Sequence, residues 1–177
     1  MSLRMMLPEG GKRFYSGHVI RFAHTGTRGR FQTYRASVRP WTWFLSRTAD
    51  CRIFQNLTVP DIVKQVFADH GLADYRLTLS GSYRKRDYCV QYRETDLDFV
   101  SRLLEEEGIY TFFEHAQNKC TLVLADAYAA HTSVASYASV AFVENRLGRA
   151  DELGHIDSWQ FERTVMPGKT LLVDYDF

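Results

Sequence analysis

The sequence has few cysteines, and they lie far apart. Cys51, Cys89 and Cys120 include no CxxC pair, which argues against a disulfide framework and against a zinc knuckle. We therefore expect three free thiols that are partly buried.

Long apolar runs are missing as well. No run approaches the roughly 20 residues that a membrane-spanning helix needs, so we expect no membrane anchor. The N-terminal stretch MSLRMMLPEGG lacks the apolar region and the cleavage site of a signal peptide. We therefore expect that the protein is made in the cytoplasm and that any export uses another route.

The chain has almost no excess of charge of either sign. Its 22 Lys and Arg residues stand against 21 Asp and Glu residues, which gives a net charge of +1. This balance creates no global field that would attract nucleic acid or anionic lipid, so neither is expected as a partner. If the chain self-associates, we expect apolar contacts to dominate and the sensitivity to salt to be modest.

Several catalytic and ligand-binding motifs are absent. The six histidines include no HExxH motif, and the chain contains no GxSxG motif. The glycine-containing stretch Gly26–Arg30 lacks the GK[ST] of a phosphate-binding loop. We therefore expect no catalytic residue, no metal and no cofactor, and we do not interpret the chain as an enzyme.

One acidic cluster leaves an enzymatic alternative open. It consists of Glu94, Asp96, Asp98, Glu105, Glu106 and Glu107. Two suitably spaced carboxylates can act as general acid and base, so the alternative is a cell-wall glycan hydrolase that uses Glu105 and Glu106. Consecutive helical positions point in different directions, however, and Asp96 and Asp98 stand where a helix start favours negative charge. A solvated helix face explains the cluster better.

The chain is instead rich in hydrophobic and aromatic residues. Of its 177 residues, 45% are hydrophobic and 14% are aromatic, which is enough for the packed core of one domain or two small ones. Aromatic residues favour strands, and few stretches are long enough to form helices. We therefore predict an α+β fold that is mainly β, with two short helices.

The stretch 87–126 predicts a strand, a helix and a hairpin in succession. Thr95 or Asp96 can cap the helix, and Gly108 can supply the left-handed conformation that ends it. After Gly108, a β-prone run, a turn at Gln117-Asn118 and an alternating return run predict the hairpin. The apolar stripe of the helix comprises Leu97, Val100, Leu103 and Leu104.

A second helix signal has the same design. Thr58 can act as the N-cap, Pro60 stands in the first turn where its missing N–H costs little, and Asp61 adds negative charge there. Gly71 ends the helix, and residues 75–79 follow as a strand. The apolar stripe comprises Ile62, Val63, Val66 and Phe67.

The N-terminal region alternates apolar and polar residues, which predicts a meander of strands. We expect strands at 3–7, 13–22 and 31–38, with turns at 8–11 and 25–29. The alternation in the last strand places Phe31, Thr33 and Arg35 on one face and Gln32, Tyr34 and Ala36 on the other.

The segment Arg39–Leu45 is dense in aromatic residues. Because Pro40 lacks a ladder donor, we expect the segment to begin a new strand or to lie at a sheet edge. Aromatic and basic residues together could suggest nucleic-acid stacking, but the basic residues are sparse and a core or subunit interface is the preferred interpretation. Our candidate core or interface residues are Trp41, Trp43, Phe44, Phe99, Leu103, Tyr110 and Phe112.

The C-terminal part has a weaker pattern. We interpret residues 127–155 as a linker or long loop. Residues 156–165 predict a strand, Pro167-Gly168 a turn and residues 170–175 a returning strand. Strand edges must be paired, covered or charged, so we expect the chain to self-associate. An adaptor whose exposed edges pair with a peptide or protein is an alternative.

Residues 90–110, VQYRETDLDFVSRLLEEEGIY, resemble the VgrG family, the spike proteins of type VI secretion systems. The resemblance extends over nearly the whole chain. It includes Arg39–Trp41, Cys51–Gln55, Val59–Ile62, Phe112–His115, Leu122–Asp126 and Asp174–Phe177. It implies a phage tail hub-like structural protein with no catalytic residues in this region.

The resemblance also implies a division of the chain into four parts. Residues 1–46 would be part of a first β-barrel, 47–126 an α/β insertion, 127–155 a linker or long loop, and 156–177 the first hairpin of a second β-barrel. In such a spike base, three copies form a tube that stacks on the tube protein Hcp next to baseplate components. The implied role is export through the secretion system and delivery of effectors into target cells, a virulence function.

Overall fold

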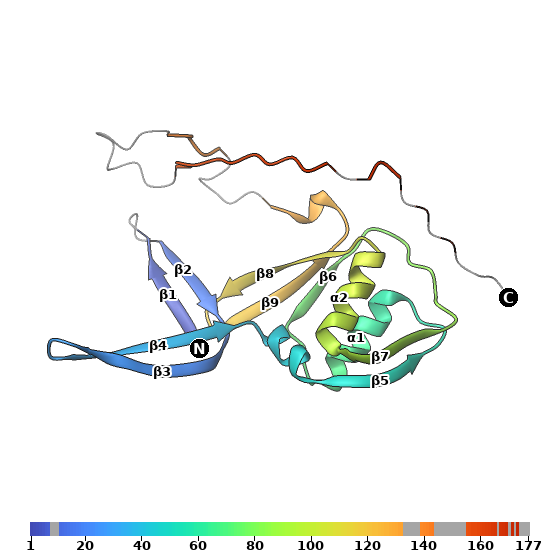
Figure 1. Cartoon of the computed structure of the whole chain (residues 1–177), viewed down its shortest axis with the longest axis horizontal. Helices are drawn as coiled ribbons and strands as arrows, with labels where there is room; N and C mark the ends of the chain where they lie inside the picture. The colour runs from blue at the N-terminus through green and yellow to red at the C-terminus, as the bar shows by residue number, and fades with distance from the viewer. Residues whose placement is uncertain are drawn as a thin grey trace. The chain divides into compact units, whose positions relative to one another are not determined.

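The structure, a computed structural model shown in Figure 1, describes residues 1–7, 11–132, 139–143, 155–165, 167–169, 171 and 173. The chain divides into two compact units, Met1–Ala130 (unit 1) and His131–Phe177 (unit 2). Most of the regular structure consists of strands, and two short α-helices accompany them. The predicted α+β class, mainly β, is confirmed.

The strands and helices that the structure describes all belong to unit 1. The strands are β1 (Ser2–Met6), β2 (Lys12–Ser16), β3 (His18–Arg28), β4 (Phe31–Arg39), β5 (Ala49–Phe54), β6 (Tyr75–Thr78), β7 (Cys89–Thr95), β8 (Tyr110–Ala116) and β9 (Lys119–Ala125). The helices are α1 (Val59–Asp69), α2 (Asp96–Glu106) and the 3-10 helices η1 (Trp41–Arg47) and η2 (Tyr128–Ala130). The sheets have the orders β1-β2, β3-β4, β5-β7 and β6-β9-β8. Strand β6 runs parallel to β9, and the other pairs are antiparallel.

Helix α2 begins and ends where the local signals predict. Thr95 is the N-cap, and its side-chain oxygen accepts a hydrogen bond from the backbone N–H of Asp98 at 3.1 Å. Gly108 has φ +69°, a conformation that glycine adopts without strain at the end of a helix. The buried apolar side chains of α2 are Phe99, Val100, Leu103 and Leu104. The predicted stripe is therefore wrong at one position, because Leu97 is only half-buried against the core and Phe99 is buried in its place. The following β8–β9 hairpin is confirmed as well.

Helix α1 also follows its prediction. The side-chain oxygen of Thr58 accepts a hydrogen bond from the backbone N–H of Asp61 at 3.3 Å, and Gly71 has φ +66°. The predicted stripe of Ile62, Val63, Val66 and Phe67 is fully buried. Strand β6 follows the helix, as predicted.

The prediction of one continuous strand at 13–22 is wrong. The expected strand at 13–22 is divided at Gly17 into β2 and β3, which belong to different sheets. A Cβ atom at position 17 would lie 2.7 Å from the backbone carbonyl oxygen of Arg39. The chain therefore passes close to the end of β4 here, and a tertiary contact rather than a local turn signal breaks the strand.

The turn predicted at 25–29 is also wrong. Residues 25–28 belong to β3, and the chain reverses at Gly29-Arg30. Gly26, with φ +126°, lies beside a register shift in the β3–β4 ladder. The glycine signal thus marks a β-bulge within the strand instead of its end.

The strand or sheet edge expected over Arg39–Leu45 is replaced by helix η1. Pro40 precedes the helix with φ −65°, and its carbonyl oxygen accepts a hydrogen bond from the N–H of Trp43 at 3.1 Å. Trp41 and Leu45 are both buried. Side chains three positions apart align along a 3-10 helix, so Trp41 and Leu45 leave η1 on neighbouring sides, and both are buried in the core.

The core of unit 1 gathers side chains from η1, α1, α2, β5, β7 and β9. Figure 1 shows α1 and α2 together with β5 and β7. The ring of Trp41 meets that of Phe67 edge-on at 5.1 Å between centroids, and Phe54 stacks on Phe99 at 5.5 Å. These aromatic contacts link the 3-10 helix and the sheet to both α-helices.

Unit 2 has little regular pairing among its described residues. Phe142 and Ile156 form an isolated parallel bridge. The strand predicted at 156–165 is not formed beyond Ile156, because alternation makes a strand only where a partner supplies the ladder. The returning strand expected at 170–175 falls largely outside the described residues, and the predicted four-part division stays a prediction.

The three cysteines are free thiols, as expected. Cys89 and Cys120 are buried, whereas Cys51 is exposed, so the expectation of three partly buried thiols is wrong for Cys51. Burial raises the pKa of the Cys89 and Cys120 thiols. None of the helices that the structure describes is long and apolar enough to cross a membrane.

Candidate interaction surface

Strands β3 and β4 form a two-stranded ribbon, here called the arm, that extends away from α1 and α2 (Figure 1). The register shifts between Val19 and Arg21 and between His24 and Gly26, so β3 has one extra residue at each place while β4 stays regular. Residues paired across an antiparallel ladder share a face, and successive residues of one strand point to opposite faces. The arm therefore has two distinct faces.

One face, here called the aromatic face, carries three rings in contact. His24 pairs with Tyr34, and their ring centroids are 5.3 Å apart. Phe22 stacks on Tyr34 at 5.4 Å with an interplanar angle of 15°. Phe22 is 67% exposed and Tyr34 is 57% exposed. An aromatic stack this exposed is typical of a surface that meets another molecule.

The other face, here called the arginine face, is basic. It carries Arg21, Arg28, Arg35 and Arg39, whose cross-strand partners are Ser37, Phe31, Ala23 and His18, respectively. All four arginines are exposed. Their guanidinium groups present planar arrays of donors that suit carboxylate or phosphate groups.

Neither face of the arm is buried by the part of the chain that the structure describes. Every residue of β3 and β4 is exposed or half-buried, although these are the two longest strands that the structure describes. An isolated two-stranded hairpin is marginally stable in water, and each strand of such a sheet has one unpaired outer edge. The arm thus has two faces and two strand edges that are open to further contacts.

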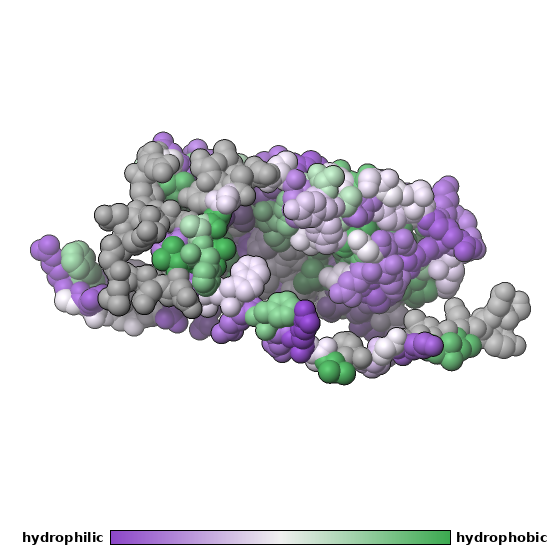
Figure 2. All heavy atoms as spheres, turned by 90° about the horizontal axis from the view of Figure 1, so that it is seen from above, coloured by the Kyte–Doolittle hydropathy of each residue, from purple (hydrophilic) through white to green (hydrophobic). Residues whose placement is uncertain are grey.

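Hydrophobic side chains also reach the surface outside the arm. Figure 2 shows hydrophobic groups among the hydrophilic ones on the face that it views. Met5, Ile53 and Tyr92 are more than half exposed and come from three different strands. Because these residues do not form a stacked group, the arm remains the better-defined candidate surface.

The seven candidate core or interface residues differ in how deeply they are buried. Trp41, Phe99 and Leu103 are buried, Trp43, Tyr110 and Phe112 are half-buried, and Phe44 is 38% exposed. The ring of Phe44 lies edge-on to that of His18 at 5.0 Å, so it contacts the first residue of the arm. The role of any of the seven in an interface stays a prediction.

The sequence prediction did not select the arm residues Phe22 and Tyr34. The alternation over residues 31–36 does predict the two faces of β4, and the ladder register confirms them. A second sequence signal for the arm was available, because the sequence contains no Asp or Glu between Glu9 and Asp50. The register of β3 could not be predicted, since its two extra residues depend on pairing with β4.

A buried polar network connects the elements of unit 1 around the helices. The side chain of Asp96 is 1% exposed; it accepts a hydrogen bond from the amide of Gln91 at 2.7 Å and forms an ion pair with Arg52. Nε2 of His70 lies 2.6 Å from its second carboxylate oxygen. These four side chains come from β5, β7, the end of α1 and the start of α2, so one carboxylate ties four elements together.

Four residues of the acidic cluster that motivated the hydrolase alternative are engaged in ion pairs, and they are Glu94, Asp96, Glu106 and Glu107; Glu105 takes part in none of the recorded pairs. Glu106 lies 2.6 Å from Arg86 and 3.3 Å from Arg102, and Arg102 also pairs with Glu94 at 2.7 Å. Partial burial would raise the pKa of Glu106, but the hydrogen bonds and charges of Arg86 and Arg102 lower it overall. A glycosidase needs a carboxyl group with a raised pKa as its general acid. The geometry therefore favours the solvated helix face.

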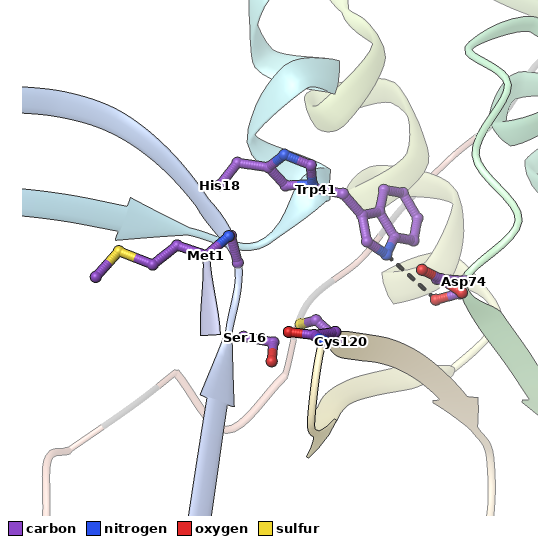
Figure 3. Close-up of a pocket in the computed structure, with 8 residues that line it drawn as sticks. Met1, Ser16, His18, Trp41, Asp74 and Cys120 are labelled. Atoms are coloured by element: carbon purple, nitrogen blue, oxygen red, sulfur yellow. Dashed lines mark hydrogen bonds between the residues drawn. The ribbon is translucent and has the colours of Figure 1, made fainter. Parts of the chain in front are cut away.

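A small hollow of about 160 Å³ lies where the N-terminal hairpins meet the rest of unit 1. The residues labelled in Figure 3 are Met1, Ser16, His18, Trp41, Asp74 and Cys120. The indole N–H of Trp41 donates a hydrogen bond to the backbone carbonyl of Asp74 at 3.2 Å, and the hydroxyl of Ser16 donates one to the carbonyl of Ala116 at 2.8 Å. These bonds identify the hollow as a junction that attaches β2 and η1 to the three-stranded sheet.

Comparisons with known proteins give a consistent result. The family described as phage tail baseplate hub (GPD) matches residues 1–177. Two type VI secretion system spike proteins of Pseudomonas aeruginosa, VgrG1a and VgrG1c, are each 51% identical to the chain over all 177 residues. The chain covers 27% of the first protein and 24% of the second, so it spans about a quarter of the length of these curated relatives.

A more distant relative and a solved structure agree with this result. The spike protein VgrG3 of Vibrio cholerae is 32% identical over 163 residues, which are 90% of this chain and 15% of that protein. The solved structure is that of the E. coli c3393 protein, a component of the type VI secretion system described as similar to the T4 bacteriophage tail proteins gp27 and gp5. It matches with a TM-score of 0.68 and 26% identity, covering 81% of this chain and 39% of that one.

Proposed function

Because this chain belongs to the phage tail baseplate hub family, of which the VgrG spike proteins are members, we propose that it forms a non-enzymatic structural part of a type VI secretion spike base. Copies of the chain associate, with a trimer as the expected state. Residues 1–46 and 156–177 contribute strands to two β-barrels, residues 47–126 form the insertion between them, and residues 127–155 connect the insertion to the second barrel.

The observation that supports self-association most directly is the uncovered arm. Its 11-residue and 9-residue strands carry a stacked aromatic pair, Phe22 and Tyr34, in water. Burying these rings against another copy would remove apolar surface from water and stabilise both the ribbon and the assembly. The exposed outer edges of β3 and β4 offer backbone pairing in addition.

The remaining partners follow from the family. In the proposed assembly, the associated chains stack on an Hcp-like tube protein, contact baseplate components, and leave the cell through the secretion system together with its effectors. The support is the 51% identity to spike proteins of that system and the baseplate hub family itself.

The oligomeric state of the purified chain tests the proposal. Light scattering coupled to size-exclusion chromatography over a concentration series should give a mass that rises to that of an oligomer. A strict monomer at the highest concentration would overturn self-association by this chain.

A matched pair of variants tests the role of the aromatic face. The double substitution Phe22→Ser and Tyr34→Ser should weaken association, whereas Tyr88→Ser, which removes another exposed ring, should leave it unchanged. Far-UV circular dichroism would verify that each variant is folded. Equal effects of the two changes would argue against a specific role for the arm.

The non-enzymatic assignment has its own test. Incubation of the purified chain with peptidoglycan should release no soluble glycan fragments, and Glu106→Gln should behave like the unsubstituted protein. Release of fragments that is abolished by Glu105→Gln or Glu106→Gln would establish the hydrolase instead.

A further inference from the structure

The balanced total charge of the chain conceals an unequal distribution. No Asp or Glu occurs between Glu9 and Asp50, a stretch that contains the entire arm, while every other acidic residue lies from Asp50 onward. The whole-chain net charge of +1 is therefore the sum of a basic N-terminal part and an acidic remainder. An interaction can be strongly electrostatic here even though the total is close to zero.

The arm concentrates this positive charge on one side of a ribbon. Cross-strand pairing places Arg21, Arg28, Arg35 and Arg39 on the arginine face. Like charges along one face repel one another, and no acidic side chain of the arm can offset them. Among the residues that the structure describes, no ion pair involves these four arginines, and the recorded pairs join residues between 50 and 114. A molecule that covers this face therefore has to supply carboxylates or other anions.

The rest of unit 1 supplies suitable carboxylates. Residues 50–126 contain more Asp and Glu than Lys and Arg. Among the described residues of this stretch, Asp87 and Glu105 are exposed and take part in none of the ion pairs. A second copy of the chain thus presents the charge that the arginine face lacks.

We infer that the arginine face of the arm docks on the acidic 50–126 region of a second copy, so that the chains associate head to tail. This inference rests on the self-association proposed above and specifies its surface and its orientation. Contact between two arms would instead place arginines of both copies together, which is unfavourable. A head-to-tail contact uses two different patches, and repetition of it can close a ring.

The first consequence is a strong dependence on salt, which replaces the modest sensitivity that the near-zero total charge alone predicts. Contacts between exposed charges are screened over about 8 Å at physiological ionic strength and over about 3 Å at 1 M. Raising sodium chloride should therefore shift the purified full chain toward monomer in light scattering. Association that does not change between low and high salt would overturn the inference, while leaving the proposed self-association in place.

Charge reversal in the arm tests the surface directly. The double substitution Arg21→Glu and Arg35→Glu should weaken self-association by about tenfold or more. The control is the double substitution Arg4→Glu and Lys12→Glu, which makes the same change in net charge at two exposed residues outside both the arm and the 50–126 region. Circular dichroism would establish that both variants are folded, and equal weakening in both would show that net charge, not the arm, is responsible.

A mixing experiment separates the two possible orientations. Arm-to-arm association predicts that the Arg21→Glu, Arg35→Glu chain pairs preferentially with the unsubstituted chain, because opposite charges then face each other. Head-to-tail association predicts that the variant binds through its intact acidic region and shortens assemblies of the unsubstituted chain. Preferential one-to-one pairing would overturn the inferred orientation.

Two further outcomes would overturn the inference. If the unsubstituted chain is monomeric at every salt concentration, both the self-association and this inference fail. If it stays monomeric but binds an oligothymidine, and the arm substitutions remove that binding, the arginine face is a nucleic-acid surface instead. An assembly that weakens in salt and in the arm variant but not in the control supports the inference.

Discussion

Nε2 of His70 lies 2.6 Å from a carboxylate oxygen of Asp96, which joins the residue that ends α1 to the first residue of α2. The same carboxylate pairs with Arg52. Its removal takes this acceptor from His70 and leaves Arg52 with Asp69, at 3.0 Å, as its remaining close carboxylate partner. Loss of one member of a buried ion pair typically costs about 3–5 kcal/mol. We therefore expect Asp96→Ala to lower the free energy of unfolding by about 3 kcal/mol, measured by urea denaturation.

The control for this prediction is a surface ion pair. Glu114 pairs with Arg76 at 2.6 Å, and both side chains are about half exposed. Exposed pairs contribute little to stability, so Glu114→Ala should leave the unfolding midpoint nearly unchanged. Similar midpoints for Asp96→Ala and Glu114→Ala would show that the buried network does not stabilise the fold.

Trp41 is predicted to be a major stabilising side chain. It is 4% exposed, contacts Phe67 edge-on and donates a hydrogen bond to the carbonyl of Asp74. Replacing a buried aromatic ring by alanine leaves a cavity and costs about 3–5 kcal/mol. Trp41→Ala should therefore lower thermal stability far more than Trp43→Ala, because Trp43 is half-buried. Equal effects in differential scanning calorimetry would contradict the placement of Trp41 in the core.

Asp126 should make stability depend on acidic pH. Its carboxylate accepts hydrogen bonds from the backbone N–H groups of Gly81 and Ser80 and from the hydroxyl of Tyr83. These bonds lower the pKa of Asp126 below the ordinary value of 3.8. The stabilisation is therefore complete above pH 3.8 and is lost as the pH falls toward the lowered folded-state pKa.

A variant isolates this contribution. Asp126→Ala should be less stable than the unsubstituted chain near neutral pH, and the difference should shrink in urea titrations as the pH is lowered through the acidic range. A difference that stays constant at acidic pH would mean that ionisation of Asp126 does not contribute to the stability of the 80–83 loop.

Gly17 is predicted to be sensitive to any added side chain. A Cβ atom there would lie 2.7 Å from the backbone carbonyl oxygen of Arg39 and 2.9 Å from a methyl group of Val38. Overpacking of this kind typically costs about 1–3 kcal/mol, because backbone must move to relieve it. Gly17→Ala should lower the melting temperature. An unchanged melting temperature would show that β2 and β4 can move apart without loss of stability.

Local signals predicted the two helices and the β8–β9 hairpin well. A cap at Thr58 or Thr95, an apolar stripe and a terminal glycine all act within a few residues of one another, so tertiary context has little left to decide. The alternation that predicted the two faces of β4 succeeded for the same reason.

The failures all involve partners that are distant along the chain. The segment Trp41–Arg47 forms a 3-10 helix instead of a strand, and Trp41 and Leu45 are both buried in the core. Gly17 ends β2 because β4 passes beside it. Residues 157–165 alternate apolar and polar side chains but form no strand in the structure, because alternation alone does not supply a partner strand for backbone pairing.

The sequence by itself determined the class of the fold, the limits of α1 and α2, and the resemblance that leads to a spike base. Only the tertiary structure decided which interactions the charged side chains make and which faces they share. It placed Asp96 in a buried network, where low exposure makes one carboxylate hold four elements together. It also placed the arginines of β3 and β4 on one face, because pairing in register determines which residues of two strands lie side by side.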